Sequence, residues 1–190
     1  FTFWEVERRI ASSLKERLLN EKDSVDVDAI ADLVSERKAG HWLTGSGSDT
    51  GERKAIRDAY DAIVAAAQLF ALYSAHRHHL KFDSAEAVLS AYVSDLYRFD
   101  QLYRLFSVRA KAAIGQGWDL LKTLAEEVER VYDQGFVQPL GVEWSRLLDQ
   151  GFLGKWSCKD MPAQQGFYSS TIRPHLQESD RKRAFVIISD

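Results

Sequence analysis

The sequence predicts a mostly α-helical protein, in which a multi-helix domain is followed by one terminal β-strand. The 190 residues include only three prolines, at positions 139, 162 and 174, so long helices can form with few interruptions. Apolar residues recur at helical rather than alternating spacing through most of the chain. The last segment, 184–190, is instead a short apolar run ending in Ser-Asp, which is typical of a buried strand.

The composition sets the class of protein. With 45% hydrophobic and 12% aromatic residues, the chain can bury a core of ordinary size, which excludes full disorder. Its 25 basic and 28 acidic residues give a net charge of -3, so no overall field attracts nucleic acid or anionic lipid. The single cysteine, Cys158, cannot form an internal disulfide, and no apolar run approaches the roughly 20 residues of a membrane helix. We therefore expect a cytoplasmic protein that does not contact a membrane.

Neither end of the sequence resembles a natural terminus. The first residue is Phe1 rather than Met, and no basic or small-residue signal precedes the first amphipathic stretch. At the other end, the apolar run 184–190 stops where the loop after a strand should begin. The sequence thus indicates a segment of a longer protein.

The first half of the chain contains three expected helices. The first has one apolar face, formed by Phe3, Val6, Ile10 and Leu14. Asp26 is placed to cap a second helix that runs through Lys38 and ends at Gly40. The Gly- and Ser-rich stretch 43–51 is the clearest loop, and it lacks the strand, spacing and Lys of a phosphate-binding P-loop. A long helix follows, rich in alanine at 65–67, and should end near the histidines at 76–79.

The second half contains further helices. Ser84 is placed to cap the next one, and helix resumes over 95–114 until Gly115 and Gly117 break it. A stripe of Leu121, Leu124, Val128 and Val131 predicts a helix that ends near Gly135, and another lies over 142–148. After an irregular stretch, 152–162, we expect a last helix over 167–177 and then the basic turn and strand.

Two groups of residues invite a functional interpretation. His76, His78 and His79 point in different directions on a helix and lack a further ligand at metal-binding spacing, so structural roles are favoured. The segment 97–106 has aromatic anchors, and Asp100 and Arg104 are spaced to form an ion pair. This segment indicates a helix-packing node, with a base-stacking platform as the alternative.

The basic triplet Arg181, Lys182 and Arg183 also leaves two interpretations open. Cations at fixed positions can bind the phosphates of a nucleic acid. A solvated turn that precedes a strand is the favoured alternative.

Three groups of residues, in this order, resemble the central region of type A PglZ proteins. The first consists of Tyr97, Asp100, Tyr103, Arg104 and Phe106. The second consists of Val128, Glu129, Tyr132, Phe136, Leu140 and Trp144. The third is the run Arg183-Ala-Phe-Val-Ile-Ile-Ser-Asp190. Each motif alone is weak, whereas the ordered set is fairly specific.

The resemblance implies a division of the chain and a place in a larger enzyme. PglZ proteins belong to BREX bacteriophage-resistance systems, and their carboxyl-terminal part resembles the alkaline phosphatase superfamily. By this resemblance, residues 1–180 form a helical domain and 181–190 the first strand of an alkaline-phosphatase-like α/β domain. Asp190 would then be the first ligand of a divalent metal, commonly zinc, in the intact parent. A carboxylate at the carboxyl end of a strand is well placed for such a role.

The resemblance implies no cofactor and no catalysis for this segment by itself. The expected role is a non-catalytic scaffold that binds the rest of the PglZ chain and other BREX proteins, such as BrxB or the methyltransferase PglX. The parent would be a metal-dependent phosphatase or phosphodiesterase. Two alternatives stay open: a nucleic-acid-binding segment, or a region whose Tyr103, Arg104 or His79 completes the substrate pocket of the parent.

Overall fold

A computed structural model describes residues 3–44, 51–152, 154, 158, 164–178 and 183–187. The chain divides into two compact units, 1–145 and 146–190. The first unit contains the main hydrophobic core, to which residues from Phe3 to Leu140 contribute. The expectation of a domain over 1–180 and a separate strand over 181–190 stays a prediction.

The first unit begins with two helices joined by a short turn. Helix α1 spans Phe3–Asn20 and helix α2 spans Val27–Ala39, followed by the single turn α3, His41–Thr44. Asp26 caps α2 as predicted, because its carboxylate accepts a hydrogen bond of 3.0 Å from the backbone N–H of Ala29. Gly40 ends the helix, which confirms the second predicted boundary.

The apolar face predicted for the first helix is partly wrong. Val6 is 40% exposed, and the buried side chains of α1 are Glu7, Ala11, Leu14 and Leu18. The helix is rotated so that Glu7 faces inward. Partners for that carboxylate on α2 and α4 explain the rotation, because they satisfy a charge that would otherwise be costly to bury.

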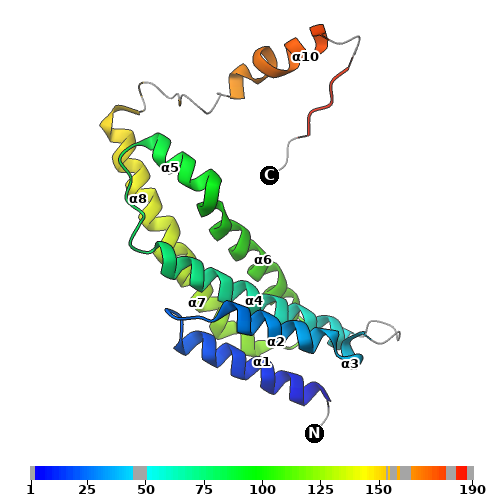
Figure 1. Cartoon of the computed structure of the whole chain (residues 1–190). Helices are drawn as coiled ribbons and strands as arrows, with labels where there is room; N and C mark the ends of the chain where they lie inside the picture. Colours follow the sequence, from blue (N-terminus) through cyan, green and yellow to red (C-terminus); the bar gives the residue numbers. More distant parts are fainter. Residues whose placement is uncertain are drawn as a thin grey trace. The chain divides into compact units, whose positions relative to one another are not determined.

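Helix α4, Gly51–His76, is the central element of the first unit. It contacts α1, α2, α6 (Tyr97–Ile114) and α7 (Lys122–Tyr132), and half of its residues are buried. Its length and its end near the histidines match the prediction, although it begins inside the stretch predicted as a loop. Residues 45–50 of that loop lie outside the described residues. Figure 1 shows α2 and α6 on either side of α4.

The helical path continues from α5 into α6. Helix α5, Ala85–Ala91, is capped by Ser84, whose hydroxyl accepts a hydrogen bond of 3.1 Å from the backbone N–H of Ala87. A π-helical turn, Tyr92–Leu96, joins it to α6. The inner face of α6 buries Phe99, Leu102, Phe106, Ala110 and Ala113. Gly115 then ends the helix, and Gly117 adopts a positive φ of 86°, so these two predicted breaks are confirmed.

The helix does not end near Gly135, contrary to the prediction. Helix α7, a π-helical turn over Asp133–Val137 and helix α8, Gln138–Leu147, follow one another directly. Gly135 does not end the helix but lies where α4 comes very close. A Cβ atom at this position would lie 2.6 Å from the ring of Tyr73 on α4, so glycine allows the two helices to approach closely.

The second unit is described only in parts. It contains π-helical turns over Leu148–Phe152 and Tyr168–Ile172 and the helix α10, Arg173–Glu178. The helix predicted over 167–177 is therefore present, and most of the predicted irregular stretch 152–162 lies outside the described residues.

The mostly helical fold class is confirmed, but the predicted strand is not formed in its described part. Residues 183–187 have no regular secondary structure, and Phe185 and Ile187 are about 90% and 93% exposed. A strand is stabilised by hydrogen bonds to a neighbouring strand, and no other strand occurs among the described residues. Within the described ranges, no helix is both long and apolar enough to cross a membrane.

Candidate interaction surface

A buried ionic cluster joins the first three long helices. The Glu7 carboxylate of α1 is fully buried and accepts hydrogen bonds from the guanidinium of Arg37 on α2 and the hydroxyl of Tyr60 on α4. Burial, followed by the hydrogen bond to Glu7, raises the pKa of Tyr60, so this hydroxyl keeps its proton. The cluster therefore holds α1, α2 and α4 in one register.

A second ionic cluster joins α4 to α2 and α6. The side chain of Asp58 is 4% exposed and lies 2.6 Å from Lys54 Nζ and 2.7 Å from Arg109 Nη1. Burial by itself favours the neutral acid, but hydrogen bonds from Lys54 and Arg109 outweigh it and lower the pKa of Asp58. Asp61, one turn further along α4, lies 2.5 Å from Lys38 Nζ of α2 and 3.8 Å from Arg109 Nε.

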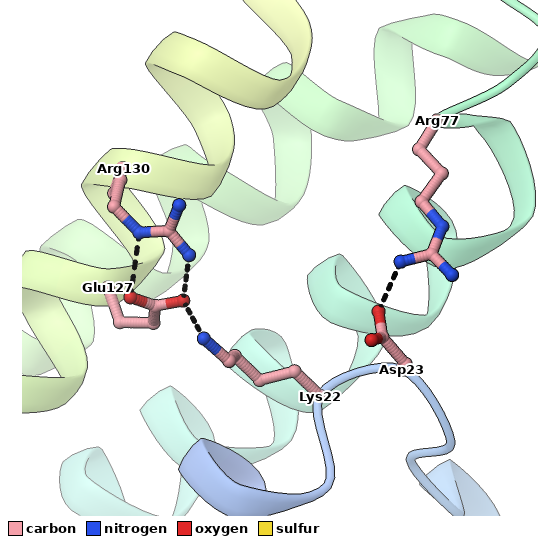
Figure 2. Close-up of polar contacts among 5 residues, drawn as sticks. All are labelled: Lys22, Asp23, Arg77, Glu127 and Arg130. Carbon is pink, nitrogen blue, oxygen red and sulfur yellow. Dashed lines mark hydrogen bonds and ion pairs between the residues drawn. The ribbon is translucent and has the colours of Figure 1, made fainter.

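Side chains of the turn between α1 and α2 form polar contacts with two other parts of the fold, as Figure 2 shows. The ammonium of Lys22 lies 2.6 Å from Oε1 of Glu127 on α7, and Arg130 donates two further hydrogen bonds to the same carboxylate. The neighbouring Asp23 accepts a hydrogen bond from Arg77, just beyond the end of α4. These bonds connect adjacent residues of one turn to two different helices.

Four residues of the first two recognised motifs meet between α6 and α7, namely Asp100, Tyr103, Glu129 and Tyr132. Asp100 accepts hydrogen bonds from the hydroxyls of Tyr92 and Tyr132, and Tyr103 donates to Glu129. The rings of Tyr103 and Tyr132 are stacked, with centroids 3.9 Å apart and planes 3° apart. The structure thus supports a helix-packing node in this segment.

The ion pair predicted between Asp100 and Arg104 is absent from the described structure. Asp100 instead accepts one hydrogen bond on each carboxylate oxygen, from the hydroxyls of Tyr92 and Tyr132. The hydrogen bond to Asp100 also raises the pKa of Tyr92, and that to Glu129 raises the pKa of Tyr103. Sequence reasoning did not include Tyr92 in the cluster, although its spacing of eight residues from Asp100 places both on one side of the helical path.

The remaining predicted site residues lie apart from this cluster. Phe106 is buried in the core, Trp144 is half-buried on α8, and Tyr97 is 43% exposed on the outer side of α6. Arg183 is exposed, whereas Arg181, Lys182 and Asp190 lie outside the described residues, so the predicted metal ligand and most of the basic triplet have no described geometry.

The histidines do not converge. His76 forms a hydrogen bond of 2.7 Å with Asp95 and lies edge-on to Phe99, while His78 and His79 are exposed. Across the parts of the chain that the structure describes, no three His, Cys, Asp or Glu side chains are grouped so that they could hold a metal ion.

The outer side of α6 is apolar and exposed. Exposed apolar side chains lie along this helix and the preceding π-helical turn, namely Val93, Tyr97, Leu105 and Val108. Arg104 lies among them, and it makes no hydrogen bond or ion pair within the described structure. Because a soluble protein normally buries such a stripe, this face is the candidate interaction surface.

A groove adjoins this face over α4. Its walls are Ala31, Val34, Ser35 and Lys38 of α2 and Leu105 and Arg109 of α6, and its floor is formed by Asp61, Val64, Ala65 and Gln68 of α4. The groove is open to solvent and has a volume of about 500 Å³. The ionic contacts of Asp61 with Lys38 and Arg109 cross one end of this groove.

Comparison with known proteins gives two relatives. The chain is 31% identical over 186 residues to the "Alkaline phosphatase-like protein BrxZ" of Escherichia coli O9:H4 (strain HS). The aligned region covers 97% of this chain and 21% of that protein. It is 25% identical over 165 residues to the "Alkaline phosphatase-like protein PglZ" of Bacillus cereus (strain H3081.97). Here the aligned region covers 87% of this chain and 18% of that protein. The chain therefore spans about a fifth of the length of these relatives. No family model and no solved structure matches it.

Proposed function

Because the chain belongs to the PglZ family of alkaline phosphatase-like proteins, we propose that it is the helical scaffold of a longer, metal-dependent phosphatase or phosphodiesterase in BREX phage defence. In this proposal, the segment itself is not catalytic. The divalent metal, zinc in our proposal, is held by the rest of the parent chain, with Asp190 as its first ligand. The proposed partners are the rest of that chain and other BREX proteins, such as BrxB or PglX.

The outer face of α6 is the observation that carries this proposal. Val93, on the π-helical turn that precedes α6, is 67% exposed, and Val108 on α6 is 62% exposed, although the opposite side of α6 is part of the core. Burying an apolar side chain contributes about 1.5–3 kcal/mol, so covering these residues with another protein surface would stabilise a complex. A scaffold protein can bind its partners through such an exposed apolar face.

The ionic and aromatic clusters support the same role, because they make the first unit a stiff support. Asp58 and Asp61 hold α6 to α4 from one side, and the stacked tyrosines hold it to α7 from the other. A surface mounted on fixed helices loses little conformational entropy when a partner binds.

Measurements of activity and metal content test whether catalysis belongs to the rest of the parent chain and not to this segment. We expect the 190-residue chain to hydrolyse no phosphodiester and to contain no stoichiometric metal. A version extended beyond Asp190 through the phosphatase-like region should gain both. Hydrolysis of bis-p-nitrophenyl phosphate and metal analysis by mass spectrometry measure these properties. Activity of the 190-residue chain itself would refute the proposal.

The scaffold role is tested by a substitution on the outer face of α6. Val108→Glu in the extended protein should abolish co-purification with BrxB or PglX while hydrolysis by the extended protein is unchanged. Ser90→Glu, at an exposed position of α5, is the matched control and should keep the complex. If both variants co-purify with partners as the unmodified protein does, this face of α6 is not the scaffold surface.

A further inference from the structure

A pocket of the first unit lies between the turn that follows α4 and the helical path of α8. One wall comes from residues 77–81, and the other comes from residues between 134 and 143. This α4–α8 pocket is open to solvent and has a volume of about 610 Å³. Known ligand pockets span roughly 300–1,000 Å³, so the space suits a small organic molecule.

Basic side chains gather on one wall of the α4–α8 pocket. Arg77, His78 and Lys81 all line it, although they lie within five residues of one another. His78 and Lys81 are exposed, and within the described ranges neither side chain makes a hydrogen bond or an ion pair. On the other wall, the side-chain amide of Gln134 also has no partner among the described residues. Donor groups from two segments of the chain are therefore open to a ligand.

The turn that carries these donors is fixed before any ligand binds. Arg77 donates a hydrogen bond to Asp23 through Nη1, as Figure 2 shows, and its other nitrogens make no bond in the part of the chain that the structure describes. The backbone N–H of Phe82 donates a hydrogen bond of 2.7 Å to Oε1 of Glu143 on α8. Leu80, between these two anchors, is 8% exposed and belongs to the core. Ordering the turn therefore costs little conformational entropy on binding.

The charges around the pocket favour an anion. Arg77 and Lys81 each carry a full positive charge, and Glu143 is the one carboxylate among the lining residues. Glu143 is 7% exposed and is engaged by Phe82, so little of its surface is accessible to a ligand. The carboxyl end of α4 adds a partial negative charge of about half an elementary charge, which the two cations outweigh.

Apolar surface borders the same pocket. Leu80, Pro139 and Val142 line it, and Val142 is 73% exposed. A bare inorganic anion would contact only the donors and would leave this surface in water. A ligand with a flat apolar body would cover both parts of the pocket.

From these features we infer that the α4–α8 pocket binds a phosphate monoester with an aromatic body, of the size of a nucleotide. The guanidinium of Arg77 and the ammonium of Lys81 bind the phosphate, and His78 and Gln134 donate further hydrogen bonds to it. A phosphate dianion has three acceptor oxygens, which match two cations and two further donors better than a carboxylate does. This inference goes beyond the proposed scaffold role and does not depend on it.

Calorimetric titration of the 190-residue chain with three probes tests the inference. Adenosine 5′-monophosphate should bind about 10-fold more tightly than adenosine, which lacks the charge, and than inorganic phosphate, which lacks the ring. The difference from adenosine should shrink as salt is added. Equal affinities for the nucleotide and adenosine, or no binding of the nucleotide, would overturn the inference. A tetraglutamate peptide that binds as tightly as the nucleotide would overturn it too, because the site would then select acidic peptides.

Removal of one cation locates the binding site. Lys81→Ala should weaken binding of adenosine 5′-monophosphate about 10-fold, since it removes a charged donor to the phosphate. Lys111→Ala is the matched control, because Lys111 is an exposed lysine on α6 that does not line the pocket. This variant should bind the nucleotide as the unmodified chain does. If the two substitutions have equal effects, the nucleotide binds elsewhere and the inference is wrong.

A charge placed at the apolar edge gives the second arm of the test. Val142→Glu should weaken binding of the nucleotide, and Val142→Lys should leave it tighter than in the Glu variant by about 10-fold or more at low salt. Because Val142 is 73% exposed, neither change disturbs the core. Both variants lose the same apolar contact, so their difference reports the sign of the charge alone. Equal affinities of the two variants would overturn the inference.

Discussion

Asp26 and Ser84 set the beginnings of α2 and α5, because each side chain accepts a hydrogen bond from a backbone N–H only three residues away. Gly135 acts over a longer range, because the ring of Tyr73 on another helix leaves no room for a Cβ atom. The buried position of Glu7 depends likewise on Arg37 and Tyr60, which are distant in the sequence.

Gly135→Ala should destabilise the protein by about 1–3 kcal/mol, since the new methyl group forces the packed ring of Tyr73 to move. Urea unfolding followed by circular dichroism measures this free energy. Gly141→Ala is the matched control, because a Cβ atom there meets nothing within 4 Å. It should stabilise the helix by about 0.5–1 kcal/mol. Equal effects of the two substitutions would contradict the close-approach explanation.

Glu7→Ala should cost about 3–5 kcal/mol of unfolding free energy, because it leaves the guanidinium of Arg37 and the buried hydroxyl of Tyr60 without their acceptor. The same urea titration provides the measurement. Glu16→Ala removes a carboxylate that is 58% exposed and paired with Lys15, and the loss should stay below about 1 kcal/mol. A small loss for Glu7→Ala would mean that the cluster does not hold the three helices.

At the scale of elements, the periodicity predicted most helices but not their junctions. The helical spacing of apolar residues correctly predicted α4 and α6, because each helix has one wide buried face. The π-helical turns at 92–96 and 133–137 could not be recognised from that spacing. The tyrosine cluster between α6 and α7 could be predicted only as a packing node, since hydrogen-bond partners on different helices cannot be assigned from one sequence.

The contact between α4 and α6 should make stability depend on acidic pH. The pKa of Asp58 is lowered in the folded state, so the unfolded chain binds its proton more readily. The contribution of Asp58 is therefore present above its unfolded pKa and is lost as pH falls through the lower folded value. Unfolding free energies measured at pH values from neutral to acidic should show this loss, and Asp58→Asn should reduce it.

Asp32→Asn serves as the control for this pH dependence. Asp32 is exposed and makes no ion pair within the described ranges, so its removal should leave the acid-side loss in place. An identical pH profile for the unmodified chain and Asp58→Asn would show that the bonds to Lys54 and Arg109 do not stabilise the folded state.

For the whole molecule, the sequence indicated a helical body and its family. The predicted boundary at 180 followed from the strand-like run after it, and it stays a prediction. The two compact units, 1–145 and 146–190, follow from the distribution of contacts, which a linear pattern does not contain. The groove over α4 could not be predicted for the same reason, since side chains from three separate helices form it.

A chain that ends at Ser145 should fold by itself, because the main core is built from residues that precede this position. Its far-ultraviolet circular dichroism should remain helical, and its unfolding free energy should lie within about 1 kcal/mol of the value for the same transition in the full chain. A chain that ends at Lys122 loses the core residues Leu124, Val128 and Val131 and should not unfold cooperatively. If the chain ending at Ser145 is unfolded, residues 146–190 contribute to the core after all.

The bonds that hold the turn between α1 and α2 also bear on how the protein reaches its folded state. Lys22 and Glu127 are 105 residues apart in the chain, whereas α4 and α6 are separated only by the segment 77–96 and can associate by closing a much shorter loop. Joining distant segments requires closing a long loop, which costs chain entropy before any contact forms. We therefore expect this turn to dock late in folding, so that weakening it speeds unfolding and leaves the folding rate almost unchanged.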